Sequence, residues 1–117
     1  MRFRIGAAVA AAVFAAAAGV AAAKTLDNKM NDDLLKMPEN ERAAWLARTV
    51  GEWCIGTHPF EMGVAQTGAS AGNAYWSFSC LSGGSYVVQL DMTGHGVAID
   101  CQSFDRDAHG MKCFHKF

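Results

Sequence analysis

Four cysteines in a chain of 117 residues constrain its fold more than any other feature of the sequence. They are Cys54, Cys80, Cys101 and Cys113, so two disulfides with three possible pairings are available. The sequence contains no C-x-x-C motif, which argues against a thioredoxin-like redox pair, a c-type haem attachment site and the common zinc-ribbon spacing. We therefore expect two structural disulfides in one small domain.

Residues 1–23 have the pattern of a secretory signal peptide. Arg2 and Arg4 give a basic start, 19 of the 23 residues are apolar, and three alanines end the stretch at a site that suits a signal peptidase. A membrane anchor is the alternative, because the run can just reach across a bilayer, but alanine is weakly hydrophobic and the run ends in small residues. We predict cleavage before Lys24, a mature domain over residues 24–117 without membrane insertion, and a periplasmic or secreted location in a bacterium.

The start of the mature chain has the periodicity of helices. Met30, Leu34 and Met37 are spaced as one face of a short first helix. Pro38 ends that helix and suits the first turn of a second one, which is predicted to run from Pro38 to Val50. The apolar stripe of the second helix comprises Trp45, Leu46, Val50 and Trp53.

From Trp53 onward the hydrophobic period changes to two, and glycine-rich breaks recur at short intervals. This pattern predicts short antiparallel strands, and the short connections imply a meander. The predicted strands are Phe60–Gln66, Asn73–Cys80, Ser85–Met92, Val97–Phe104 and Met111–Phe117.

Alternation along these strands assigns one face of the sheet to the core. That face comprises Trp76, Phe78, Cys80, Tyr86, Val88, Leu90, Met92, Val97, Ile99 and Cys101. The opposite face is expected to be wet, with Tyr75 and Phe114 as candidates for an exposed contact patch. Its polar members are Ser77, Ser79, Gln89, Asp91, Asp100 and Gln102. The predicted fold class is α+β, with an N-terminal helical segment packed on one face of a four- to five-stranded antiparallel meander sheet.

The predicted meander selects one pairing of the cysteines. Cys80 and Cys101 would lie on strands separated by a third strand, about 9–10 Å apart at two inter-strand spacings, which exceeds the reach of a disulfide. Cys80 and Cys113 would lie farther apart still, unless the sheet closed into a barrel. The surviving pairing joins Cys54 to Cys80 and Cys101 to Cys113. The first disulfide would link the helical segment to the sheet, and the second would staple the last hairpin.

Charge and motifs exclude several classes of function. Removal of the signal peptide leaves 8 basic and 11 acidic residues, a formal charge of −3, so neither nucleic acid nor an anionic membrane surface is an expected partner. No G-x-S-x-G, H-E-x-x-H, P-loop or strand-linked dinucleotide motif is present. The remaining 94 residues therefore offer little for a catalytic site. We predict that the protein is not an enzyme and has no cofactor.

One stretch near the C-terminus carries metal-binding residue types. His109, Met111 and His115 would share one face of the last predicted strand with Cys113, and imidazole with thioether suits copper. Against such a site, Cys113 is assigned to a disulfide, and ligands along one flat strand spread over about 20 Å. The sequence therefore favours a non-catalytic periplasmic or secreted binding protein, with another envelope or extracellular protein as its expected partner. A soft-metal, copper-type binding protein is the alternative.

Overall fold

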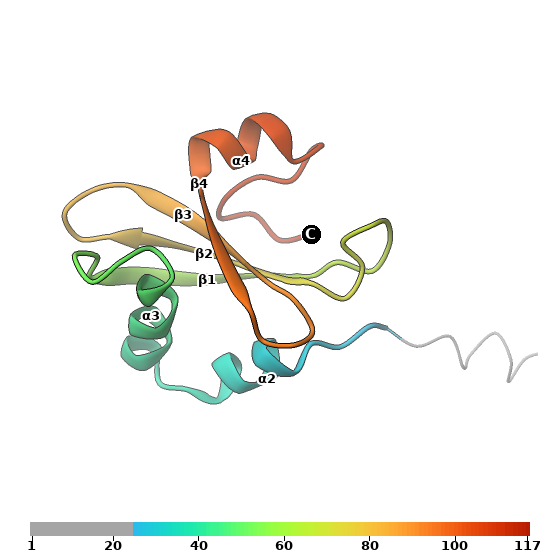
Figure 1. The fold of residues 1–117 in the computed structure, drawn as a ribbon, viewed down its shortest axis with the longest axis horizontal. Coiled ribbons are helices and arrows are strands. Elements are labelled where there is room, and N and C mark those ends of the chain that lie inside the picture. Colours follow the sequence, from blue (N-terminus) through green and yellow to red (C-terminus); the bar gives the residue numbers. More distant parts are fainter. Residues whose placement is uncertain (1–24) are drawn as a thin grey trace, which may run out of the picture.

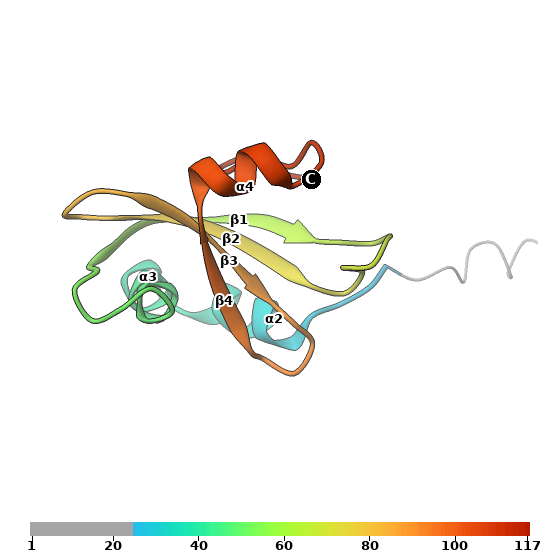
Figure 2. The same ribbon diagram turned by 45° about the horizontal axis from the view of Figure 1, so that its top comes forward.

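The computed structural model describes residues 25–117, and the predicted signal peptide lies outside these residues. The described part is an α+β structure whose sheet is a four-stranded antiparallel meander in the order β1-β2-β3-β4. Helices α2 and α3 lie on one side of the sheet, whereas α4 and the C-terminal segment lie on the other (Figures 1 and 2). The elements are α2 (Lys29–Lys36), α3 (Glu39–Arg48), β1 (Gly56–Val64), β2 (Ala74–Cys80), β3 (Ser85–Leu90), β4 (Gly96–Asp100) and α4 (Cys101–Asp107).

Both N-terminal helices predicted from the sequence are confirmed. α2 begins after Asn28, whose side-chain oxygen accepts a hydrogen bond from the backbone N–H of Asn31 and so caps the helix. α3 begins after Pro38, with Glu39 and Glu41 in its first turn, where the helix dipole favours negative charge.

The apolar stripe predicted for the second helix is confirmed in part. Leu46 is fully buried, and Trp45 and Val50 are partly buried against the core. Trp53 is 56% exposed, because α3 ends at Arg48 and the helical spacing does not continue to residue 53.

A first cluster of buried side chains fills the space between these helices and the sheet. Its largest member, Trp76, is fully buried and donates its indole N–H to Asn31 Oδ1 at 2.7 Å. α3 approaches β1 so closely that a Cβ on Gly56 would overlap the backbone carbonyl of Ala43. The predicted core face of β2 and β3 is thereby confirmed in its central residues: Trp76, Phe78, Cys80, Val88 and Leu90.

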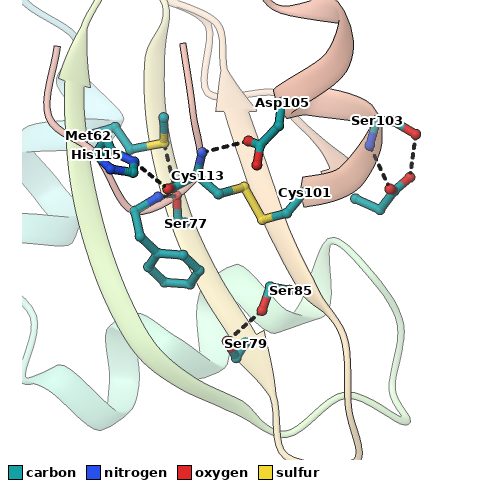
Figure 3. Close-up of a disulfide and its surroundings, with 11 residues drawn as sticks. Met62, Ser77, Ser79, Ser85, Cys101, Ser103, Asp105, Cys113 and His115 are labelled. Atoms are coloured by element: carbon teal, nitrogen blue, oxygen red, sulfur yellow. Dashed lines mark hydrogen bonds between the residues drawn. A yellow bond between two sulfur atoms is a disulfide. The ribbon is translucent and has the colours of Figure 1, made fainter.

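On β2 and β3 the face predicted to be wet is covered by a second core, so that prediction is wrong there, whereas Asp100 and Gln102 are exposed as predicted. Ser77 is fully buried and Tyr75 is 1% exposed, because α4 and the C-terminal segment pack over them. The buried hydroxyl of Ser77 donates to Met62 Sδ and accepts from the backbone N–H of Phe114, both at 2.9 Å (Figure 3). Phe114 is itself partly buried, so neither it nor Tyr75 belongs to an exposed patch.

The face assigned to β4 is also wrong. Val87 pairs with Ile99 and Val88 pairs with Ala98, so Ile99 points into the second core rather than the first. Cys101 also packs with the second core, while Val97 is 48% exposed and Met92 is 64% exposed. Alternation fixes which residues of one strand share a face, but the connecting turn decides which face that is.

The last two predicted strands are wrong in extent or in kind. β4 ends at Asp100, whose carboxylate accepts hydrogen bonds from the backbone N–H and the hydroxyl of Ser103, both at 2.9 Å, and so caps α4. The residues from Met111 to Phe117 form no strand. Phe114 has a φ of 61°, which extended backbone does not allow.

Both predicted disulfides are confirmed, but one has a different structural role. Cys54–Cys80 links the segment after α3 to the end of β2, as expected. Cys101–Cys113 joins the first turn of α4 to the C-terminal segment (Figure 3), and no hairpin is involved. The second disulfide therefore holds the cover of the second core in place.

Candidate ligand-binding pocket

A pocket of about 820 Å³ lies on the side of the sheet that α4 covers. Its walls come from the sheet, from the connection between β1 and β2, from α4 and from the C-terminal segment. Most of the lining is apolar. The larger apolar residues of the wall are Val64, Tyr75, Ile99, Phe104, Met111 and Phe117.

Tyr75 and Gln89 form the polar part of the pocket that belongs to the sheet. They lie directly opposite each other on β2 and β3 and share the same face. The Tyr75 ring packs between Phe104, at a centroid distance of 6.1 Å, and Phe117, at 5.3 Å. Tyr75 is therefore held by its ring rather than by its hydroxyl group.

One wall of the pocket lies between the two cysteines of the second disulfide. The segment from Cys101 to Cys113 contributes six lining residues: Ser103, Phe104, Asp107, Ala108, His109 and Met111. The carboxylate of Asp105 accepts a hydrogen bond from the backbone N–H of Cys113 at 2.9 Å (Figure 3). The disulfide and this hydrogen bond fix the segment over the sheet.

The pocket has little charge. Within residues 25–117, the lining contains no lysine or arginine, and Asp107 carries its only side-chain carboxylate. Asp107 accepts two hydrogen bonds from the guanidinium of Arg106, at 3.0 and 3.1 Å. The hydrogen bonds and charge of Arg106 hold the pKa of Asp107 below its ordinary value.

The residues considered for metal binding are only partly brought together. His109 and Met111 line the pocket, whereas His115 is not part of its lining. The Nδ1 atom of His115 lies 3.0 Å from the carbonyl oxygen of Cys113, and the strand on which the three were to share a face does not form. Within residues 25–117, no group of three or more His, Cys, Asp or Glu side chains is placed to hold a metal ion.

Glu61 connects the C-terminal segment to the N-terminal helices. It accepts hydrogen bonds from the Asn31 side chain at 2.9 Å and from Lys116 at 3.2 Å, and Asn31 also accepts the Trp76 indole hydrogen bond. Partial burial by itself raises the pKa of Glu61. The hydrogen bonds, together with the charges of Lys116 and Arg42, outweigh this effect and lower the pKa below its ordinary value of 4.5.

A second surface feature surrounds the other disulfide. Trp53 and Ile55 flank Cys54 and are 56% and 63% exposed, and Leu81, next to Cys80, is 70% exposed. The backbone N–H of Leu81 donates to the carbonyl of Ile55 at 2.8 Å, so these side chains belong to one end of the sheet. We call Trp53, Ile55 and Leu81 the disulfide patch.

The sequence did not reveal the sheet residues of the pocket. Alternation predicts a wet face for Gln89 and an exposed patch for Tyr75, because no signal in the sequence between Cys101 and Cys113 indicates a helix above them. The signal that pointed toward the site was Tyr75, an aromatic residue that alternation put on the polar face.

Within residues 25–117, no helix combines the length and hydrophobicity needed to cross a membrane. Two disulfides are compatible with a secreted or extracellular protein. Comparison of the chain with protein-family models, with curated proteins and with solved structures gives no match.

Proposed function

We propose that the protein is a small, non-catalytic binding protein of the bacterial periplasm or extracellular space, and that the pocket beneath α4 binds an apolar ligand. The observation that carries this proposal is the pocket itself. Its volume of about 820 Å³ is within the range of small-molecule sites, which are mostly apolar with a few polar groups. The signal peptide predicted for residues 1–23 supports the proposed location.

The polar groups around the pocket support a binding role rather than a catalytic one. Among the described residues of the lining, His109 is the only histidine. Ser103 donates its hydroxyl hydrogen bond to Asp100, and Asp107 pairs with Arg106. Neither Ser103 nor Asp107 is hydrogen-bonded to His109, so these residues do not form the nucleophile and base pair that covalent catalysis requires.

The test is a titration with N-phenylnaphthylamine, an uncharged dye whose fluorescence rises in apolar sites. Ile99→Arg places a charge and extra volume in the pocket and is expected to weaken dye binding by about tenfold or more. Val97→Arg is the matched control, because Val97 lies on the same strand and face but outside the pocket lining. It is expected to bind like the wild type.

A second variant covers the outcome in which Ile99→Arg fails to fold. Ala69→Trp adds volume at an exposed position of the β1–β2 connection that lines the pocket. Circular dichroism confirms folding of each variant. Equal dye affinity in the wild type, Val97→Arg and the folded pocket variants would overturn the proposal.

The disulfide patch favours a second candidate function, recognition of another envelope or extracellular protein. Exposed Trp is enriched among residues that dominate protein interfaces, and Trp53 stands beside two exposed aliphatic residues. A purified candidate partner should bind the wild type and Ile99→Arg equally, but should lose affinity for the Trp53→Ala, Leu81→Ser double variant. The reverse pattern would assign the partner to the pocket.

A further inference from the structure

The pocket contains polar side chains that form no hydrogen bond to any other residue in the described part of the chain. The side chain of Tyr75 is almost entirely buried, with 1% of the residue exposed. Within residues 25–117, its hydroxyl group forms no hydrogen bond, and neither does the side-chain amide of Gln89, which is half-buried. A buried polar group without a partner costs free energy, and such groups in native structures call for an explanation.

The side chains of Tyr75 and Gln89 lie next to each other on neighbouring strands. Tyr75 and Gln89 are opposite residues of an antiparallel ladder, so their side chains leave the sheet side by side. Both line the same pocket, among Ile99, Phe104 and Phe117. The pocket therefore offers one hydroxyl and one amide, each able to donate and accept, inside an apolar wall.

The charges of the lining restrict the ligand further. An anionic head group would find no lysine or arginine among the lining residues that the structure describes, and would lie near the carboxylate of Asp107. A cationic head group would find that carboxylate already paired with Arg106. An uncharged polar group needs no counter-charge and is the best match for a phenol and an amide.

We propose that the ligand is a neutral amphiphile: an apolar chain or ring system with one uncharged hydroxyl, carbonyl or amide group. The apolar body contacts Ile99, Phe104 and Phe117, and the polar group hydrogen-bonds to the Tyr75 hydroxyl and the Gln89 amide. This inference rests on the proposed function of the pocket.

The experiment compares three head groups on one chain. Dodecanol, dodecanoate and dodecyltrimethylammonium compete with N-phenylnaphthylamine for the wild-type protein, the alcohol below its solubility limit and the two ions below their micelle concentrations. Dodecanol is expected to bind about tenfold more tightly than either ion. The Tyr75→Phe variant keeps the ring between Phe104 and Phe117. It is expected to weaken dodecanol binding roughly five- to tenfold, a larger loss than for the dye, which has no hydroxyl, carbonyl or amide group.

Tyr86→Phe is the matched control, because Tyr86 packs against the first core on the other face of the sheet. It should leave all affinities unchanged. Binding of an ion as tightly as dodecanol, or equal dodecanol affinity in Tyr75→Phe and the wild type, would overturn this inference alone. Failure of the dye and all three amphiphiles to bind the wild type would overturn the proposed function as well.

Discussion

Cys101, the first residue of α4, is joined by a disulfide to Cys113 in the C-terminal segment, and the residues between them form one wall of the pocket. Replacing both cysteines by serine is predicted to abolish dye binding, because the wall is then no longer fixed over the sheet. The free energy of unfolding should fall by about 3 kcal/mol, as expected for a short closed loop.

The matched control for this variant is the double serine replacement of Cys54 and Cys80, which lie away from the pocket. It should also lower stability, but it should bind the dye normally under conditions where it is folded. Chemical denaturation and dye titration measure the two effects separately. Unchanged dye affinity in the Cys101→Ser, Cys113→Ser variant would show that the pocket does not need its disulfide.

Two tryptophans with very different burial give a second prediction. Trp76→Ala is expected to lower the free energy of unfolding by about 3–5 kcal/mol, because Trp76 is fully buried and donates a hydrogen bond to Asn31. Trp53→Ala should cost less than about 1 kcal/mol, since Trp53 is 56% exposed. Urea denaturation gives both values, and similar losses in the two variants would contradict the assigned core.

Two glycines without a positive φ test the contact between helix and sheet. Gly56→Ala should be severely destabilising, because the added methyl group meets the backbone carbonyl of Ala43, which cannot move without shifting α3. Gly96→Ala is expected to be mild, since its methyl group meets side-chain atoms of Leu90 and Thr49 at 3.2 and 3.4 Å. Thermal denaturation gives the melting temperature of each variant. Equal melting temperatures would contradict the close approach of α3 to β1.

Glu61 should make stability depend on pH. The pKa of Glu61 in the folded protein is lowered from the ordinary value of 4.5. The contribution of its carboxylate to the free energy of unfolding is therefore complete above the ordinary pKa, and it is lost as the pH falls through the lower pKa of the folded protein. Relative to Glu61→Gln, the wild type is expected to be more stable at about pH 7, and this difference should shrink at about pH 3. A difference that is the same at both pH values would contradict the role assigned to the carboxylate.

The helices and the central strands could be predicted because their signals are local. Met30, Leu34 and Met37 follow the helical period, and Pro38 marks the boundary between the two helices. The disulfide pairing followed from the meander, because strand spacing alone prevents a bond between Cys80 and Cys101. These predictions required no knowledge of what covers the sheet.

The pocket could not be predicted because it depends on the C-terminal cover. The alternation of Val97, Ile99 and Cys101 is the same whichever face they occupy, and the turn from Asp91 to His95 reverses the expected face. The capping of α4 by Asp100 is visible in the sequence only as an Asp with a Ser three residues later. Because the sequence does not predict α4, it provides no reason to expect a pocket over Tyr75 and Gln89.

The most direct test of the pocket is nuclear magnetic resonance mapping with isotope-labelled wild-type protein and dodecanol. The largest chemical shift changes are predicted at backbone amides of the pocket lining, including Tyr75, Gln89, Ile99 and Phe104, with little change at the disulfide patch. Changes confined to Trp53, Ile55 and Leu81, or no saturable change anywhere, would contradict the assignment of the pocket as the binding site.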